Sequence, residues 1–217
     1  MDLGTMVREL GTGMLITTEI FVLTLVFSLP LGMVLAFGRM ARLKVLSFLT
    51  KLYISIMRGT PLMLQLMVVF YGPKLLLGVT VPGNWRFTAV IVAFVINYAA
   101  YFAEIYRGGL ESIPRGQYEA AQVLGYTKAQ TFFKIILPQM VKRVIPAVTN
   151  EVITLVKDTS LAFVLGIMEM FSAAKALAAS EVSMVPYAIA ALIYWVFCLL
   201  IEFILNRVEK RLDYYHD

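Results

Sequence analysis

The sequence has very little of the residues on which metalloenzymes, hydrolases and disulfide-rich domains depend. Its 217 residues include one cysteine, Cys198, and one histidine, His216. A disulfide framework, a histidine-based metal site and a histidine general base are therefore excluded within the chain. The phosphate-binding pattern G-x-x-x-x-G-K-[ST] is also missing, so the chain carries no cradle for ATP. We expect no catalytic residue, no metal ligand and no cofactor in this polypeptide.

Charge is scarce as well, and apolar residues take its place. Charged residues make up 15% of the chain and apolar residues 60%, whereas soluble domains have about 25% and about 45–50%. A soluble fold of this size needs a wetter surface, so lipid must cover much of the molecule. Long continuous apolar runs favour spanning helices over a barrel, which has short alternating segments. We therefore predict an all-α polytopic membrane protein, a single domain over residues 1–217, with five spans of about 20 residues: Leu15–Phe37, Leu52–Leu77, Phe87–Tyr106, Val144–Ile167 and Val185–Leu205.

The distribution of lysine and arginine predicts the orientation of these spans. The segments on one side of a five-span topology carry thirteen Lys and Arg residues, and those on the other side carry four. The richer side is cytoplasmic by the positive-inside rule. The N-terminus is then outside and the C-terminus is cytoplasmic, and the net charge of +5 reflects this bias rather than nucleic-acid binding. The outer loops are short, the longest being about Met168–Met184.

The cytoplasmic loop 107–143 is the most informative segment. Turn chemistry at Pro114 and Gly116 precedes a run of helix formers from Gln117 to Leu124, and Gly125 is typical of a residue just past a helix end. Two small residues, Ala120 and Ala121, occupy the middle of this short helix, and the helix has no cationic face. A helix that docks onto another protein is favoured over one that lies on lipid headgroups.

The loop and several other segments resemble a known family. Glu119-Ala120-Ala121 with Gly125, followed by Ile136-Leu137-Pro138, resembles the "EAA" loop of ATP-binding-cassette (ABC) importer permeases. Segments 101–109, 113–117, 58–66 and 157–161 resemble the polar amino acid subfamily of these bacterial permeases. The joint pattern, spread from Arg58 to Leu161, is far more specific than the triplet alone.

The resemblance implies a role for the loop and a set of partners. The loop would be a coupling helix that sits in a groove of a separate ATPase subunit, and ATP and Mg²⁺ would bind there. Two such ATPase subunits, a second permease subunit (identical or homologous) and an extracytoplasmic binding protein are the implied partners. The coupling positions are Gln117, Glu119, Ala120, Ala121 and Gly125.

Polar residues inside the predicted spans mark the candidate pathway, because charge is costly there and usually faces a cavity or a partner. Asn97, Tyr101 and Glu104 share one helix face, as do Glu151 and Asp158. Gln65 and Asn97 are equally compatible with hydrogen bonding between helices, and Arg58 with an interfacial position. The candidate substrate-binding residues are Arg58, Gln65, Asn97, Tyr101, Glu104, Glu151, Asp158, Thr159 and Ser160.

The predicted cargo is an amino acid, and the three acidic residues favour a cationic side chain. The main alternative is a proton- or ion-coupled secondary transporter that uses Glu104, Glu151 and Asp158 as a relay. Such carriers usually have more spans and inverted repeats, and neither is present in this sequence. A membrane-embedded enzyme is a weaker alternative, because the chain has no nucleophile–base set.

Overall fold

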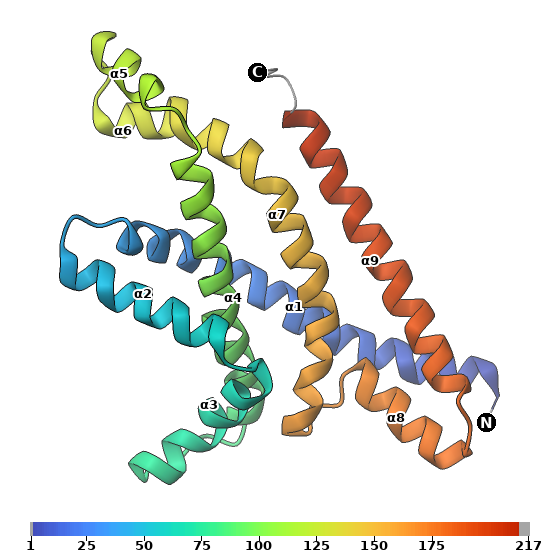
Figure 1. Ribbon diagram of the computed structural model, residues 1–217. Coiled ribbons are helices and arrows are strands. Elements are labelled where there is room, and N and C mark those ends of the chain that lie inside the picture. Colours follow the sequence, from blue (N-terminus) through green and yellow to red (C-terminus); the bar gives the residue numbers. More distant parts are fainter. Residues whose placement is uncertain (1, 213–217) are drawn as a thin grey trace.

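The computed structural model describes residues 2–212, and all regular structure in that range is helical (Figure 1). A π-helical turn, Phe132–Ile136, precedes α7, and a 3₁₀ segment, Thr159–Leu165, follows it. The α-helices are α1 (Leu3–Arg39), α2 (Lys44–Gly59), α3 (Leu62–Leu77), α4 (Trp85–Glu111), α5 (Arg115–Val123), α6 (Lys128–Thr131), α7 (Leu137–Asp158), α8 (Met170–Glu181) and α9 (Val185–Leu212). The predicted all-α fold is confirmed, and the single histidine, His216, lies outside the described residues.

Within residues 2–212, α1, α4 and α9 are each long and apolar enough to cross a membrane. Two bent pairs of helices bring the total to as many as five spans, in agreement with the predicted number. One pair is α2 and α3, which meet at an angle of 111°. The predicted span Leu52–Leu77 is therefore broken into two helices at Thr60 and Pro61. Pro61 cannot donate a backbone hydrogen bond to the preceding turn, and the chain is extended at Thr60 and Pro61.

The core is built on α4, which packs most extensively against α1. Gly32 of α1 permits the close approach, because a Cβ there would lie 2.7 Å from the Cβ of Phe102. Phe94, Tyr98 and Phe102 of α4 are fully buried or nearly so. By contrast, α9 exposes a row of large apolar side chains along most of its length, as a lipid-facing helix does.

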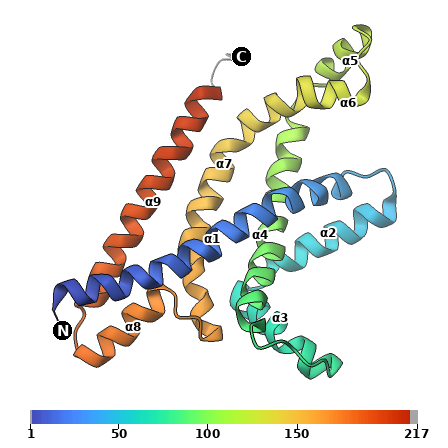
Figure 2. The same cartoon turned by 180° about the vertical axis from the view of Figure 1, so that it is seen from behind.

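The ends of the molecule hold different elements (Figures 1 and 2). Helices α5 and α6 lie at the same end as the C-terminal end of α9. The N-terminal end of α1, helix α8 and the far end of α3 lie at the opposite end. The segment Met168–Met184, expected as a loop, contains α8. The buried carboxylate of Glu169 caps this helix by accepting 2.7 Å hydrogen bonds from the backbone N–H groups of Phe171 and Ser172.

Candidate functional site

A cavity of about 370 Å³ lies where the middle of α4 and the C-terminal half of α7 meet the break between α2 and α3. Its volume falls in the range of small-molecule pockets, about 300–1,000 Å³. The wall combines carboxylates, phenol rings, an amide and the extended backbone at the break. Its lining residues are Thr60, Pro61, Leu62, Asn97, Tyr98, Tyr101, Glu151, Thr154, Asp158 and Leu161.

The two carboxylates of the cavity come from α7, seven residues apart. Glu151 and Asp158 are both partly buried, and neither forms an ion pair with any residue in the described part of the chain. The hydroxyl of Tyr98 donates a 2.7 Å hydrogen bond to Asp158 Oδ2 and so ties α4 to α7. Sequence reasoning missed Tyr98, although its spacing of three residues from Tyr101 could have placed both on one helix face.

Gln65 and Asn97 hold the broken helix together. The Gln65 side-chain amide donates to the backbone carbonyls of Met57 at 2.9 Å and Thr60 at 3.1 Å. Asn97 Nδ2 donates to the Met57 carbonyl at 3.0 Å and to Gln65 Oε1 at 2.9 Å. The carbonyls of Met57 and Thr60, which have no helical partner at the end of α2, are thereby satisfied. Of the two amides, only Asn97 also lines the cavity.

Arg58 lies beside the cavity rather than in its wall. This exposed residue is in the last turn of α2, and its guanidinium carbon is 5.3 Å from the centre of the Tyr101 ring. A cation at this distance from an aromatic face is attracted by the ring's quadrupole. Tyr101 itself lines the cavity, whereas Arg58 is not among the lining residues.

Glu104, predicted to share a face with Asn97 and Tyr101, lies outside this cavity. Its carboxylate accepts hydrogen bonds from Arg107 at 2.7 and 3.1 Å and lies 3.9 Å from Arg39 Nε. Arg107 also pairs with Glu111 at 2.6 Å. The charge of Glu104 is therefore compensated by ion pairs within the chain, whereas Glu151 and Asp158 form no ion pair in the described residues.

The hydroxyls of Thr159 and Ser160 bond to the preceding turn instead of lining the cavity. Thr159 donates to the Val156 carbonyl at 2.6 Å and is fully buried, and Ser160 donates to the Lys157 carbonyl at 2.7 Å. Serine and threonine often make such local bonds near a helix end. The structure thus brings together Asn97, Tyr101, Glu151 and Asp158, and leaves Gln65, Arg58, Glu104, Thr159 and Ser160 around them.

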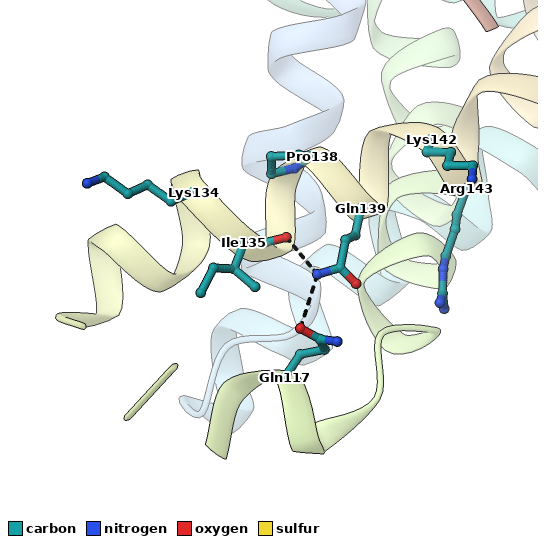
Figure 3. A pocket seen from close by; sticks show the side chains of 7 residues that line it. All are labelled: Gln117, Lys134, Ile135, Pro138, Gln139, Lys142 and Arg143. Carbon is teal, nitrogen blue, oxygen red and sulfur yellow. Dashed lines mark hydrogen bonds between the residues drawn. The ribbon is translucent and has the colours of Figure 1, made fainter. Parts of the chain in front are cut away.

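The predicted docking helix is α5, which starts two residues earlier than expected, after Pro114. Gly125 has φ of +76°, the left-handed conformation that allows the chain to leave the helix. Glu119 and Ala120 are exposed, but Ala121 is 1% exposed and packs inside the chain. Gln117 Oε1 accepts a 3.3 Å hydrogen bond from Gln139 of α7 (Figure 3). The free face of α5 therefore includes Glu119 and Ala120, with Val123 and Leu124 at its tip.

A polar cavity beside a bent helix pair, among helices long and apolar enough to cross a membrane, is typical of a membrane transport protein. The family model described as "binding-protein-dependent transport system inner membrane component" matches residues 28–214. The chain belongs to this family, and the resemblance to ABC importer permeases seen in its motifs is confirmed.

Individual relatives match over almost the whole chain. The L-cystine transport system permease protein TcyB of Bacillus subtilis (strain 168) is 36% identical over 209 residues, covering 95% of this chain and 87% of the relative. The arginine transport system permease protein ArtQ of the same organism is 38% identical over 201 residues, covering 92% and 90%. A crystal structure of an amino acid ABC transporter with histidines superposes with a TM-score of 0.84 at 32% identity, covering 97% of this chain and 99% of that one.

Proposed function

We propose that this chain is the membrane subunit of an ATP-driven importer that moves a polar amino acid with a cationic side chain across the bacterial cytoplasmic membrane. The observation that carries the proposal is the cavity between α4, α7 and the α2–α3 break. There Glu151 and Asp158 face one space without a lysine or arginine partner in the described chain. Carboxylates in a membrane cavity that form no ion pair within the chain favour a cationic ligand.

The relatives support an amino acid as cargo. Two of them are named as transport permeases for cystine and for arginine, and the solved structure is of an amino acid transporter with histidines. The aromatic faces of Tyr98 and Tyr101 suit a guanidinium, imidazolium or ammonium group. Arginine, lysine and histidine are therefore the first substrates to test.

Coupling to ATP takes place at α5. An ATPase subunit contacts the exposed face that includes Glu119 and Ala120, and two copies of the permease pair with two ATPase subunits. Closure of the ATPases moves α5, and the attached spans alternate between inward-open and outward-open states. A binding protein delivers the substrate at the end that holds α8, so the N-terminus is outside and the C-terminus is cytoplasmic.

Reconstitution of the chain with its ATPase and binding protein in liposomes tests this proposal. We expect uptake of labelled arginine, lysine or histidine that requires ATP. The variants Glu151→Gln and Asp158→Asn should each lower this uptake at least about tenfold, because each removes a full charge from the site. The matched control is Glu104→Gln, which removes a charge that Arg107 already compensates and should leave selectivity unchanged.

Two outcomes would contradict the proposal. Uptake that follows an imposed membrane potential or proton gradient without ATP would indicate a secondary transporter. Equal uptake by Glu151→Gln, Asp158→Asn and the unmodified chain would exclude the cavity as the cation site.

A further inference from the structure

A second cavity, of about 360 Å³, lies between α5 and the start of α7, and three of its seven lining residues are cations (Figure 3). Its lining comes from α5, from the π-helical turn and from the first turns of α7. No acidic residue is among the seven that line it: Gln117, Lys134, Ile135, Pro138, Gln139, Lys142 and Arg143. Such a wall favours an anionic occupant.

Hydrogen bonds connect the elements that line this second cavity. The Gln139 amide donates to the Ile135 carbonyl at 3.0 Å and to Gln117 Oε1 at 3.3 Å, which joins α5 to α7 across the cavity (Figure 3). Arg143 donates to the carbonyl and the hydroxyl of Ser112, in the turn between α4 and α5. Lys134 lies on one side of Gln139, with its ammonium nitrogen 5.8 Å from the centre of the Tyr126 ring, and Lys142 and Arg143 lie on the other side (Figure 3).

The position of the cavity selects among possible anions. The sequence predicts that the membrane-spanning part of α7 begins at Val144, directly after Arg143, and this start places the cavity at the boundary between hydrocarbon and headgroups. Phe133, next to Lys134, is 65% exposed, and an exposed aromatic side chain at this level suits the acyl boundary. The wall itself is mixed, with the apolar Ile135 and Pro138 between the cations.

We propose that this cavity binds the phosphate headgroup of an anionic phospholipid from the leaflet on the α5 side. Basic pockets between helices at a membrane surface are suited to such headgroups. The lipid would sit against α5 and α7 together, and so would reinforce the connection between the docking helix and the span that carries Glu151 and Asp158. The proposal does not depend on which substrate is transported.

Lipid binding to the purified full-length chain in uncharged detergent tests the proposal. The probes are short-chain phosphatidylglycerol, phosphatidylcholine with the same chains, and inorganic phosphate, and native mass spectrometry counts the bound molecules. We expect phosphatidylglycerol to bind at least about tenfold more tightly than either other probe. Lys134→Gln should weaken its binding about fivefold, and Lys134→Gln with Lys142→Gln about 25-fold.

The control pair is Arg115→Gln with Lys128→Gln, cations of the same loop that do not line the cavity. This pair should change the affinity less than about twofold. An equal loss in both pairs would overturn the proposal in favour of general surface charge. Equally tight binding of inorganic phosphate, or of phosphatidylcholine, would also overturn it. If the Lys134→Gln, Lys142→Gln pair left lipid binding unchanged but abolished co-purification of the ATPase, the cavity would be a contact site for that protein instead.

Discussion

The hydroxyl of Tyr98 on α4 lies 2.7 Å from Asp158 Oδ2 on α7 and is the direct side-chain link between these two helices in the candidate substrate site. Hydrogen bonds to charged groups contribute about 1.5–3 kcal/mol. Tyr98→Phe should therefore lower the thermal unfolding midpoint and weaken substrate binding about threefold to tenfold.

Tyr106→Phe is the matched control for this substitution, since it changes another buried tyrosine of α4 that does not line the cavity. Binding of labelled arginine to the purified transporter and thermal unfolding in detergent measure the two effects. Equal behaviour of the two variants would show that the bond to Asp158 is unimportant.

The amides of Gln65 and Asn97 should contribute to stability as a unit. Asn97→Leu leaves Oε1 of the buried Gln65 without its donor, and Gln65→Leu removes the donor to the Thr60 carbonyl and one acceptor of the Asn97 amide. Each should reduce the free energy of unfolding by about 1–3 kcal/mol. The double variant should cost less than the sum, because the two amides also bond each other at 2.9 Å. Asn206→Leu, at an exposed amide on α9, is the control. Strict additivity in chemical or thermal unfolding would contradict this arrangement.

Gly125 and Gly116 flank the exposed face of α5. Alanine at these two positions distinguishes the effect of backbone conformation from the effect of added side-chain volume. Both have open space around them, but of the two only Gly125 has a positive φ. Gly125→Ala introduces strain of about 1–2 kcal/mol in the left-handed conformation, whereas Gly116→Ala lies in a helix and should be neutral or slightly stabilising. We expect fewer substrate molecules imported per ATP in Gly125→Ala only. The same ratio in both variants would disprove a coupling role for this turn.

Two glycines of α1, Gly32 and Gly11, allow a similar comparison of alanine variants for helix packing. A Cβ at Gly32 would lie 2.7 Å from the Phe102 Cβ, whereas a Cβ at Gly11, on the same helix, would meet nothing within 4 Å. Gly32→Ala should therefore destabilise the protein by about 1–3 kcal/mol through overpacking of α1 on α4. Gly11→Ala should leave the unfolding midpoint unchanged or raise it slightly. A stable Gly32→Ala variant would mean that the two helices separate easily.

Much of this organisation could be predicted from the sequence because it depends on local patterns. Apolar runs locate the spans, and turn residues locate α5. Shared helix faces correctly placed Asn97 with Tyr101 on one helix and Glu151 with Asp158 on another. Such periodicity describes a single helix but does not determine how neighbouring helices are rotated toward each other. The meeting of these two faces in one cavity therefore required the structure.

The features that could not be predicted arise from contacts between elements or from competition with the backbone. The spacing of Glu104 and Arg107 allowed an ion pair, but equally allowed Glu104 to face the pathway. The hydroxyls of Thr159 and Ser160 had both substrate and their own helix as possible partners, and bonded to the helix. The angle of 111° between α2 and α3 results from Pro61 together with the amides of Gln65 and Asn97, which lie far apart in sequence.

The break between α2 and α3 also gives the substrate cavity two electrical poles. A helix carries about half a positive charge at its N-terminus, and α3 begins at Leu62, in the cavity wall. The partial negative charge at the C-terminal end of α2 is partly neutralised, because Gln65 and Asn97 donate hydrogen bonds to the Met57 carbonyl there. Glu151 and Asp158 of α7 provide the negative pole. A zwitterion bound there is therefore expected to orient its carboxylate toward α3 and its cationic groups toward α7.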